Sequence, residues 1–380
     1  MSSEALFIAA GGTGGGIYPA LSVVEALRAR APQLALYFIG SKAGIENALV
    51  PRQGWAGFHS VQSGALHGVG RLKQLGSSLK IAMGTWQAWR LASRYRPRAL
   101  FLTGGWATFP TALGCWLRGV PILVYVPDIE PALGVRVISR FARLVLTPVP
   151  ESAAYFRRGV RVEAVGYPLR RALLSADRLT AQARFQLDPE RQTLLVFGGS
   201  LGARSLNNAL SAILPELLAD GLQVLHISGQ ADWEAVQARR AALDSAAQAR
   251  YHAFAYLHDE MGLALAAADL VVCRAGASVL GELTHFALPS ILVPYPHAWR
   301  YQKVNADWLV ARGAALRLDD AHLMSHLLPT VRALLSDPGR LEAMRQAARR
   351  AAVPNAAQRI AERLLELAKL TQSLERISGE

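Results

Sequence analysis

The feature that most constrains the fold of this chain is a glycine-rich corner, Gly11–Gly16, with five glycines in six residues. The apolar run 5–9 before it predicts a buried strand, and apolar residues at helical spacing follow it as far as Leu27. A strand, a glycine turn and a helix in that order are typical of a parallel α/β sheet. The glycines let a ligand approach closely, and the helix N-terminus favours an anion. We therefore expect a ligand-binding corner, with a tight turn serving only helix–sheet packing as the alternative.

Strand-like apolar runs alternate with helical patterns along the whole chain, which predicts an α/β fold with largely parallel sheets. A length of 380 residues is too great for one ordinary hydrophobic core. We expect two doubly wound domains with a cleft between them, divided at the Gly166-Tyr167-Pro168 segment. The expected strands lie near 36–39, 99–102, 122–126, 144–146, 162–165, 194–197, 224–227, 251–255, 270–272, 291–293 and 315–318.

The charge of the chain is strongly one-sided. The net charge is +13, and the interval between Glu46 and Asp128 has no acidic residue but nine basic ones. Such a surface suits nucleic acid, an anionic membrane, or solvent alone. Because the basic and aromatic patterns of nucleic-acid-binding modules are missing, we expect no nucleic-acid partner.

Several bulk features indicate a cytosolic protein. The chain has two cysteines, both in apolar surroundings and without metal-ligand spacing. It starts without the pattern of a secretory signal peptide, and no apolar run reaches the ~18–20 residues of a membrane span.

The segment 71–98 combines apolar and basic residues at helical spacing. One interpretation is an ordinary helix that faces the core. The other is an apolar face with basic flanks that lies on an anionic bilayer. The apolar stripe is Leu72, Leu75, Leu79, Met83 and Trp86, flanked by Lys73, Lys80 and Arg90, with Trp89, Trp116 and Arg118 as further candidates for the surface.

The chemical motifs point away from common nucleotide-binding loops. The dinucleotide fingerprint G-x-G-x-x-G is absent, because Ile17 stands where its third glycine belongs. A nucleoside triphosphate loop, a Ser–His–Asp set and zinc signatures are absent as well.

A second glycine corner, Gly198–Gly202, suits a sugar nucleotide. Its backbone N–H groups and the Ser200 hydroxyl are able to hold a diphosphate, although Ser200 as a plain helix cap is the alternative. Glu282 lies one turn into a later expected helix, where a carboxylate accepts from both ribose hydroxyls or else pairs with the helix dipole. Arg170 is suited to a phosphate or a base.

Taken together, these motifs resemble the bacterial MurG family over nearly the whole chain. The family transfers N-acetylglucosamine (GlcNAc) from UDP-GlcNAc to undecaprenyl-pyrophosphoryl-MurNAc-pentapeptide. The resemblance rests on the ordered segments 11–19, 104–105, 166–170, 198–204, 273–282, and 293–297 with Gln302 and Asn305.

The resemblance implies the GT-B fold, two Rossmann-like domains with parallel sheets that face a central cleft. Residues 1–167 would form the acceptor and membrane-facing domain, with a C-terminal helix at about 355–380 packing back on it. Residues 168–354 would bind the donor. The apolar and basic segment would be the membrane dock, formed by Leu75, Leu79, Lys80, Met83, Trp86 and Trp116.

The resemblance also implies roles for single residues. Ser200 would contact the diphosphate, Glu282 the ribose, the backbone of Leu257 the uracil, and Gln302 the sugar hydroxyls. The remaining donor contacts would come from Thr13, Gly14, Gly15, Arg170, Gly199, Ala277, Ser278 and Val279. The acceptor would contact Gly12, Gly16, Tyr18, Gly104 and Gly105.

The chain departs from the family at the expected base. The family has His where this chain has Gly16, and its His-Glu-Gln-Asn segment aligns with Tyr125-Val126-Pro127-Asp128. An inverting transfer needs a general base near the acceptor O4. We expect Asp128 or Glu130 to act as that base, with a pair of acids at a helix N-terminus as the alternative.

The sequence thus predicts a peripheral enzyme on the cytoplasmic face of the cell membrane that makes a peptidoglycan precursor. Its partners would be UDP-GlcNAc, a polyprenyl-pyrophosphate-linked acceptor and the anionic membrane surface. No cofactor or metal is required by the sequence, because N–H groups at the donor corner would stabilise the leaving UDP. The alternatives are a GT-B enzyme with another lipid-linked acceptor, and a catalytically impaired UDP-sugar-binding scaffold at the membrane.

Overall fold

The structure is a computed structural model that describes residues 4–11, 14–41, 50, 54–64, 71–199, 202–297 and 300–370, with the backbone alone for residues 71–75. The expected positions Gly12, Thr13 and Ser200 and the side chain of Leu75 lie outside the described part. The chain divides into two compact units, Met1–Arg170 with Asn355–Glu380, and Arg171–Pro354. The division after Arg170 lies near residue 167, where the sequence suggests a boundary.

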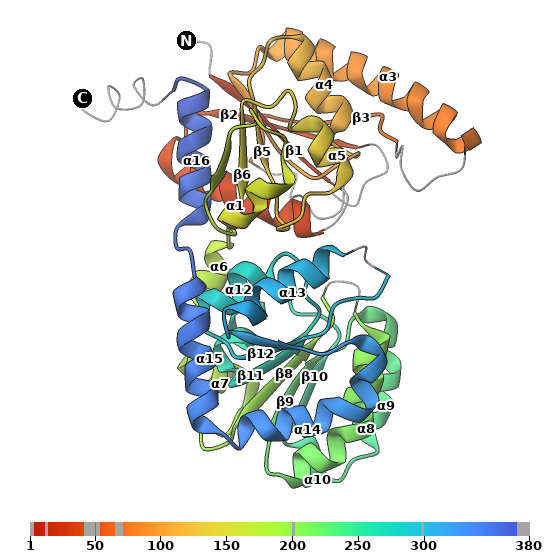
Figure 1. Cartoon of the computed structure of the whole chain (residues 1–380), viewed down its shortest axis with the longest axis vertical. Helices are drawn as coiled ribbons and strands as arrows, with labels where there is room; N and C mark the ends of the chain where they lie inside the picture. Colours follow the sequence, from red (N-terminus) through yellow and green to blue (C-terminus); the bar gives the residue numbers. More distant parts are fainter. Residues whose placement is uncertain are drawn as a thin grey trace. The chain divides into compact units, whose positions relative to one another are not determined.

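The first unit is built on a parallel sheet. Within the described residues, seven strands pair in the order β3-β2-β1-β4-β5-β6-β7 (Figure 1). The strands are β1 (Ala5–Ala10), β2 (Ala35–Ser41), β3 (Gly57–Val61), β4 (Ala99–Thr103), β5 (Ile122–Tyr125), β6 (Leu144–Thr147) and β7 (Val162–Ala164). The helices of this unit are α1 (Gly14–Arg30), α3 (Arg71–Tyr95), α4 (Phe109–Leu117), α5 (Leu133–Ile138), the 3-10 helix η1 (Pro150–Tyr155) and α16 (Ala356–Leu367).

Both faces of the first sheet are covered. In β1, Leu6 and Ile8 pack in the cluster that includes α1 and α16, whereas Phe7 and Ala9 pack in the cluster that includes α3, α4 and α5. This division follows from the two-residue period of a strand. The C-terminal helix α16 packs against α1 (Figure 1). Arg30 at the end of α1 and Glu362 of α16 form an ion pair of 2.8 Å.

The second unit has the same design. Within the described residues, six parallel strands pair in the order β10-β9-β8-β11-β12-β13. The strands are β8 (Thr193–Phe197), β9 (Gln223–Ile227), β10 (Tyr251–Phe254), β11 (Leu270–Cys273), β12 (Ser290–Leu292) and β13 (Ala315–Arg317). The helices are α6 (Arg171–Leu174), α7 (Arg178–Phe185), α8 (Arg204–Ala219), α9 (Trp233–Ala241), α10 (Ser245–Gln248), α11 (Met261–Ala267), α12 (Val279–His285), α13 (Tyr301–Ala311), α14 (Leu323–Leu335) and α15 (Pro338–Ala351), with 3-10 helices η2 (Gln230–Asp232) and η3 (Asp320–His322).

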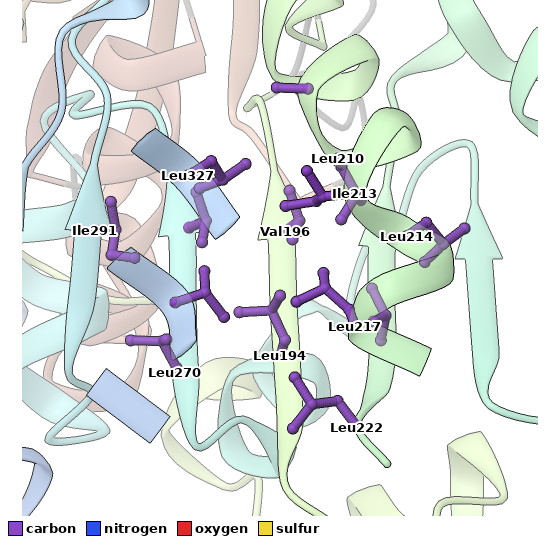
Figure 2. Packing of buried hydrophobic residues seen from close by; sticks show 14 of the residues in the cluster. Leu194, Val196, Leu210, Ile213, Leu214, Leu217, Leu222, Leu270, Ile291 and Leu327 are labelled. Carbon is purple, nitrogen blue, oxygen red and sulfur yellow. The ribbon is translucent and has the colours of Figure 1, made fainter. Parts of the chain in front are cut away.

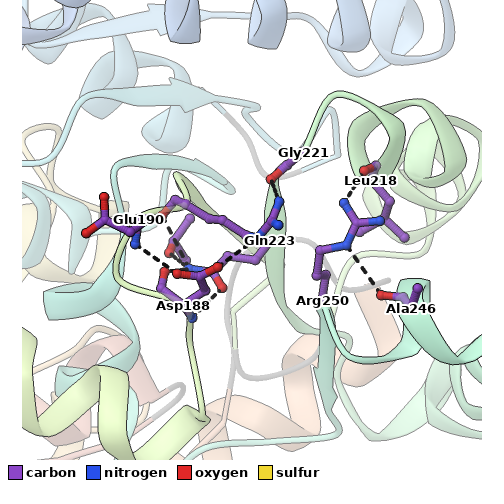
Figure 3. A network of polar contacts seen from close by, with 9 residues as sticks. Asp188, Glu190, Leu218, Gly221, Gln223, Ala246 and Arg250 are labelled. Carbon is purple, nitrogen blue, oxygen red and sulfur yellow. Dashed lines mark hydrogen bonds and ion pairs between the residues drawn. The ribbon is translucent and has the colours of Figure 1, made fainter.

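The core of the second unit lies between this sheet and the helices α8 and α14. Figure 2 shows Leu194 and Val196 of β8 against leucines of α8, with Leu327 of α14 in the same cluster. Gln223, the first residue of β9, accepts from the backbone N–H of Asp188 at 3.0 Å and donates to the Asp188 carbonyl at 2.9 Å (Figure 3). These bonds fix the amino edge of the sheet.

The expected pair of doubly wound, parallel α/β units is confirmed. One strand, β3, was missed because it has no continuous apolar run and its residues are mostly only half-buried. None of the described helices is long and apolar enough to cross a membrane.

Candidate active site

The glycine corners meet in pairs at the points where the strand order of each sheet reverses. Gly11 follows β1 and Gly104 follows β4, and these strands are neighbours in the first sheet. Gly198 follows β8 and Arg274 follows β11, which are neighbours in the second sheet. Doubly wound sheets bind ligands at the carboxyl ends of the strands at such a reversal. Each unit therefore carries its glycine corners where a ligand is expected.

The two corners of the first unit pack against each other. Gly104 has a φ of +110°, and a Cβ there would lie 2.8 Å from the Gly11 carbonyl oxygen, so only glycine fits. The Thr103 hydroxyl donates to the carbonyl of Gly16 at 2.5 Å. Gly14 and Gly15 lie beside Gly16 in the first turn of α1, and Gly105 follows Gly104. The expected acceptor residues that the structure describes here thus form one compact corner.

Tyr18 and Arg170 are joined, although the sequence assigns them to acceptor and donor respectively. The Arg170 guanidinium lies 4.7 Å from the centroid of the Tyr18 ring, a distance typical of a cation–π contact. Tyr18 follows the glycines in α1 and is half-buried. The contact places the basic side chain of Arg170 beside the first glycine corner.

The two candidate bases differ in their surroundings. Glu130 is buried and accepts from Arg136 Nη2 at 2.9 Å. Asp128 is half-buried and lies just beyond β5, near Tyr125. Burial raises the pKa of the Tyr125 phenol, and the neighbouring Tyr167 and Asp128 raise it further. Tyr125 itself donates to the Gly166 carbonyl at 3.0 Å. Asp128 is therefore the more accessible carboxylate of the pair.

The donor corner of the second unit is anchored to the start of α8. Gly202 has a φ of +76°, and a Cβ there would lie 2.5 Å from the Ser228 carbonyl oxygen. Its N–H donates to the Gly199 carbonyl at 3.0 Å. Arg204, the first residue of α8, pairs with Asp232 at 3.0 Å. The N-terminus of this long helix is thereby fixed at the switch point, with N–H groups that suit an anion.

Arg274 connects four elements of the second unit through its hydrogen bonds. It is buried, and its Nη1 donates to the Val293 carbonyl at 3.3 Å and to the carboxylate of Asp320. Its Nη2 donates to the Ser205 hydroxyl in the first turn of α8 at 2.8 Å. Arg274 thus ties the end of β11 to the end of β12, to η3 and to α8.

Glu282 is held by a nearby hydroxyl. Ser278 Oγ donates to Glu282 Oε2 at 2.9 Å, one helical turn away. Burial raises the pKa of the Cys273 thiol, and the negative charge of Glu282 raises it further, which places that charge near the end of β11. Ala277 and Val279 are buried, so any contact they make with a donor comes from their backbone.

The other expected donor residues lie at the same edge of the second sheet. Gln302 Oε1 accepts from the Tyr295 N–H at 2.9 Å, which directs its amide as a donor elsewhere. The buried Asn305 donates to the Ala275 carbonyl at 3.2 Å. Leu257 follows β10 and is buried, which leaves its backbone as the contact.

The stripe on α3 faces solvent and not the core. Leu79, Met83 and Trp86 are exposed, whereas Ile81, Thr85, Ala88 and Ala92 form the buried face of the helix, and the nearby Trp116 and Leu117 at the end of α4 are exposed as well. Lys80 is exposed, and the Arg90 guanidinium lies 4.9 Å from the Trp86 ring centroid. The core-facing interpretation of this stripe is therefore wrong for the described side chains.

The sequence did not identify the residues that anchor α8. The group consists of Ser205, Asn207, Asp232 and Asp320, and the partners of these side chains lie between 19 and 115 residues away along the chain. No local pattern signals such pairings, because only the sheet topology brings the segments together.

Comparison with known proteins identifies the family. The glycosyltransferase family 28 N-terminal domain matches residues 6–147, and the family 28 C-terminal domain matches residues 193–360. A UDP-N-acetylglucosamine–N-acetylmuramyl-(pentapeptide) pyrophosphoryl-undecaprenol N-acetylglucosamine transferase of Roseiflexus sp. (strain RS-1) is 38% identical, over 93% of each chain. The enzyme of the same name from Desulforudis audaxviator is 36% identical, over 96% of this chain and 98% of its own.

This chain belongs to the MurG family of glycosyltransferases. A crystal structure of MurG from Acinetobacter baumannii aligns with a TM-score of 0.75 and 27% identity, over 96% of this chain and 99% of that one. The match agrees with the two parallel units and confirms the GT-B fold. The matched N-terminal domain of family 28 lies in the first unit, and most of the matched C-terminal domain lies in the second.

Proposed function

We propose that this chain transfers GlcNAc from UDP-GlcNAc to the MurNAc O4 of undecaprenyl-pyrophosphoryl-MurNAc-pentapeptide, which converts lipid I to lipid II. The observation that carries the proposal is full-length similarity to transferases named for this reaction, combined with donor motifs at the switch point of the second sheet. The C-terminal unit is the donor domain, and the N-terminal unit with α16 is the acceptor domain.

The donor is bound at the carboxyl edge of the second sheet. The N-terminus of α8, with Ser200 and Gly199 before it, holds the diphosphate through N–H groups and a hydroxyl. Glu282 accepts from the ribose hydroxyls, and its orientation by Ser278 supports that role. Gln302 donates to the sugar hydroxyls, and the Leu257 backbone contacts the uracil. Arg170 is positioned by Tyr18 to meet a phosphate.

The acceptor is activated by Asp128. Its carboxylate takes the proton from the MurNAc O4 while that oxygen attacks C1 of GlcNAc. The bond between C1 and the diphosphate oxygen breaks, and UDP leaves with the electron pair. Helix N–H groups at α8 stabilise the charge that develops on the leaving diphosphate. Glu130 is less suited to this role because it is buried and paired with Arg136.

The glycines of the first unit supply space for the acceptor pyrophosphate. Gly16, Gly104 and Gly105 lie at one corner, where side chains are small or absent. This arrangement leaves backbone N–H groups at the N-terminus of α1 as the anion contacts. The absence of His at position 16 moves the proton transfer to another residue, and Asp128 fills that need.

The protein binds the cytoplasmic face of the cell membrane through α3 and the end of α4. The dock consists of the exposed Leu79, Met83, Trp86 and Trp116 with Lys80 and Arg90 beside them; Leu75 belongs to it by the sequence pattern alone, because its side chain lies outside the described part. Apolar side chains with basic neighbours are typical of helices that lie at an anionic interface. Docking there brings the acceptor domain to its lipid-linked substrate.

The experiment that tests this function is transfer of labelled GlcNAc from UDP-GlcNAc to a lipid-linked MurNAc-pentapeptide. Asp128→Asn should lower kcat by about 10²–10⁴, the usual contribution of a general base, with little change in KM for the donor. Glu130→Gln serves as the matched control and should keep most of the activity. Full kcat in Asp128→Asn would exclude Asp128 as the base.

The same assay separates the competing functions. A panel of other polyprenyl-linked sugars would reveal a different acceptor. Tight UDP-GlcNAc binding with no turnover on any acceptor would indicate a membrane scaffold instead of an enzyme.

A further inference from the structure

A buried chain of hydrogen bonds lies behind the donor corner of the second unit. Tyr251 Oη and His226 Nδ1 are 2.7 Å apart, and His226 Nε2 and Asn207 Oδ1 are 3.0 Å apart. His226 is 0% exposed and Asn207 is 1% exposed. Two neighbouring strands, β9 and β10, are thereby connected to the first turn of α8.

The direction of the hydrogen bond between His226 and Asn207 is fixed by the other contacts of Asn207. Asn207 Nδ2 is 2.9 Å from the Ser228 carbonyl and 2.8 Å from Asp232 Oδ2, and both of these can only accept. Asn207 Oδ1 is therefore the acceptor end of the amide, so His226 Nε2 carries the proton. When the imidazole is neutral, its Nδ1 accepts from the Tyr251 hydroxyl.

The burial of His226 keeps its imidazole neutral, which sets the direction of the bond to Tyr251. Burial lowers the pKa of His226 to about 4, with a further lowering by Arg239 that Asp232 opposes. The imidazole is thus neutral near pH 7, a donor at one nitrogen and an acceptor at the other.

The chain of bonds ends on the groups that hold the donor corner. The Ser228 carbonyl, which accepts from Asn207, is the group that a Cβ on Gly202 would strike at 2.5 Å. Asp232 accepts from Asn207 through one oxygen and from Arg204 Nε through the other, at 3.0 Å. A change in the orientation of Asn207 would therefore move both Gly202 and the start of α8.

We propose that His226 is a positioning residue for the donor diphosphate, which acts through Asn207 to fix the N-terminal turn of α8. Tyr251 supports it by setting the imidazole tautomer. The proposal rests on the proposed function, because it takes the N-terminus of α8 as the diphosphate site. It adds that the affinity for the diphosphate depends on a buried residue that touches no substrate.

The test compares two ligands that differ only in the diphosphate, UDP and uridine, on the full-length protein. His226→Phe fills the space of the ring but removes both bonds, and Tyr251→Phe removes only the hydroxyl. His226→Gln retains a donor for Asn207 Oδ1. His252→Phe is the matched control, because His252 is a partly buried histidine on β10 whose Nε2 has no hydrogen-bond partner among the described residues. Dissociation constants come from calorimetry or from NMR titration.

We expect His226→Phe to bind UDP about tenfold more weakly, the effect of misplacing one donor to a charged group, with uridine affinity unchanged. Tyr251→Phe should show a smaller loss in the same direction, His226→Gln should recover most of the affinity, and His252→Phe should match wild type.

Two results would overturn the proposal while leaving the proposed function intact. In the first, wild type prefers UDP over uridine but His226→Phe and Tyr251→Phe keep that preference in full. In the second, both ligands weaken in parallel, which indicates a general loss of structure. A wild-type protein without preference for UDP would instead refute the donor site itself, and the positioning role with it.

Discussion

The exposed stripe on α3 gives a quantitative prediction for membrane binding. Leu79 is 73% exposed, Met83 53% and Trp86 55%. Complete burial of such a side chain is worth about 1.5–3 kcal/mol, so covering the exposed fractions in a bilayer interface gives roughly 1–2 kcal/mol each. The three together contribute on the order of 3–5 kcal/mol. Replacement of all three by Ser should therefore weaken vesicle binding by roughly a hundredfold or more.

The assay is flotation with vesicles that contain anionic phospholipid, at low and at high salt. A matched control removes two equally exposed apolar side chains from the second unit, Leu179 at 80% and Met324 at 64%. The control variant should bind vesicles like wild type, and salt should weaken the binding of both because Lys80 and Arg90 are exposed. Circular dichroism should show unchanged unfolding in both variants, since none of the replaced side chains is in the core.

Two outcomes would refute the reasoning on α3. One is a triple Ser variant that floats with vesicles as well as wild type does. The other is an equal loss in the control variant, which would mean that binding is spread over the whole surface and has no defined dock.

Three further predictions concern single residues of the second unit. His226 has a pKa of about 4 when folded and an ordinary value near 6.5 when unfolded, so acid favours unfolding: between pH 6.5 and 4 this residue removes up to about 3 kcal/mol of stability. The free energy of unfolding in urea should therefore depend less steeply on pH in His226→Gln than in wild type. The pKa values of His59, His252 and His285 are also lowered by burial, but these residues are common to both proteins and contribute equally. Equal pH dependence in the two proteins would contradict this prediction. Arg274→Met should lower the free energy of unfolding by about 3 kcal/mol because Asp320 and two carbonyls lose their buried donor, and a loss well under about 1 kcal/mol would argue against the bridging role. Glu282→Gln should raise KM for UDP-GlcNAc roughly tenfold, and the same increase with a 2′-deoxyribose donor would show that Glu282 does not contact the 2′-hydroxyl.

Much of the fold follows from the sequence because the strands of a parallel sheet are buried on both faces. β1 and β8 are fully buried, and such strands appear as continuous apolar runs. β3 escapes this rule because it lies at the edge of its sheet, where the consecutive polar residues His59 and Ser60 interrupt the apolar run. The glycine corners were predictable for a related reason, since positions such as Gly104 and Gly202 have no room for a side chain.

The candidate site was less predictable, because its supports come from distant segments. Glu130 and Asp128 look equivalent in the sequence, but the structure buries Glu130 against Arg136 and leaves Asp128 half-buried. On α3, Leu79 and Ile81 are similar residues, yet one faces solvent and the other the core. Helical spacing reveals apolar stripes on α3. It does not tell which stripe packs against the core, because that depends on where α4 lies.

The central claim is that this chain joins GlcNAc to the MurNAc O4 of a lipid-linked precursor. The most direct test uses UDP-GlcNAc with two lipid-linked MurNAc-pentapeptide acceptors, one with a free O4 and one with that oxygen methylated. We predict a single product from the free acceptor, with a β linkage at O4 in its NMR spectrum, and none from the methylated one. Transfer to the methylated acceptor, or an α-linked product, would contradict the account.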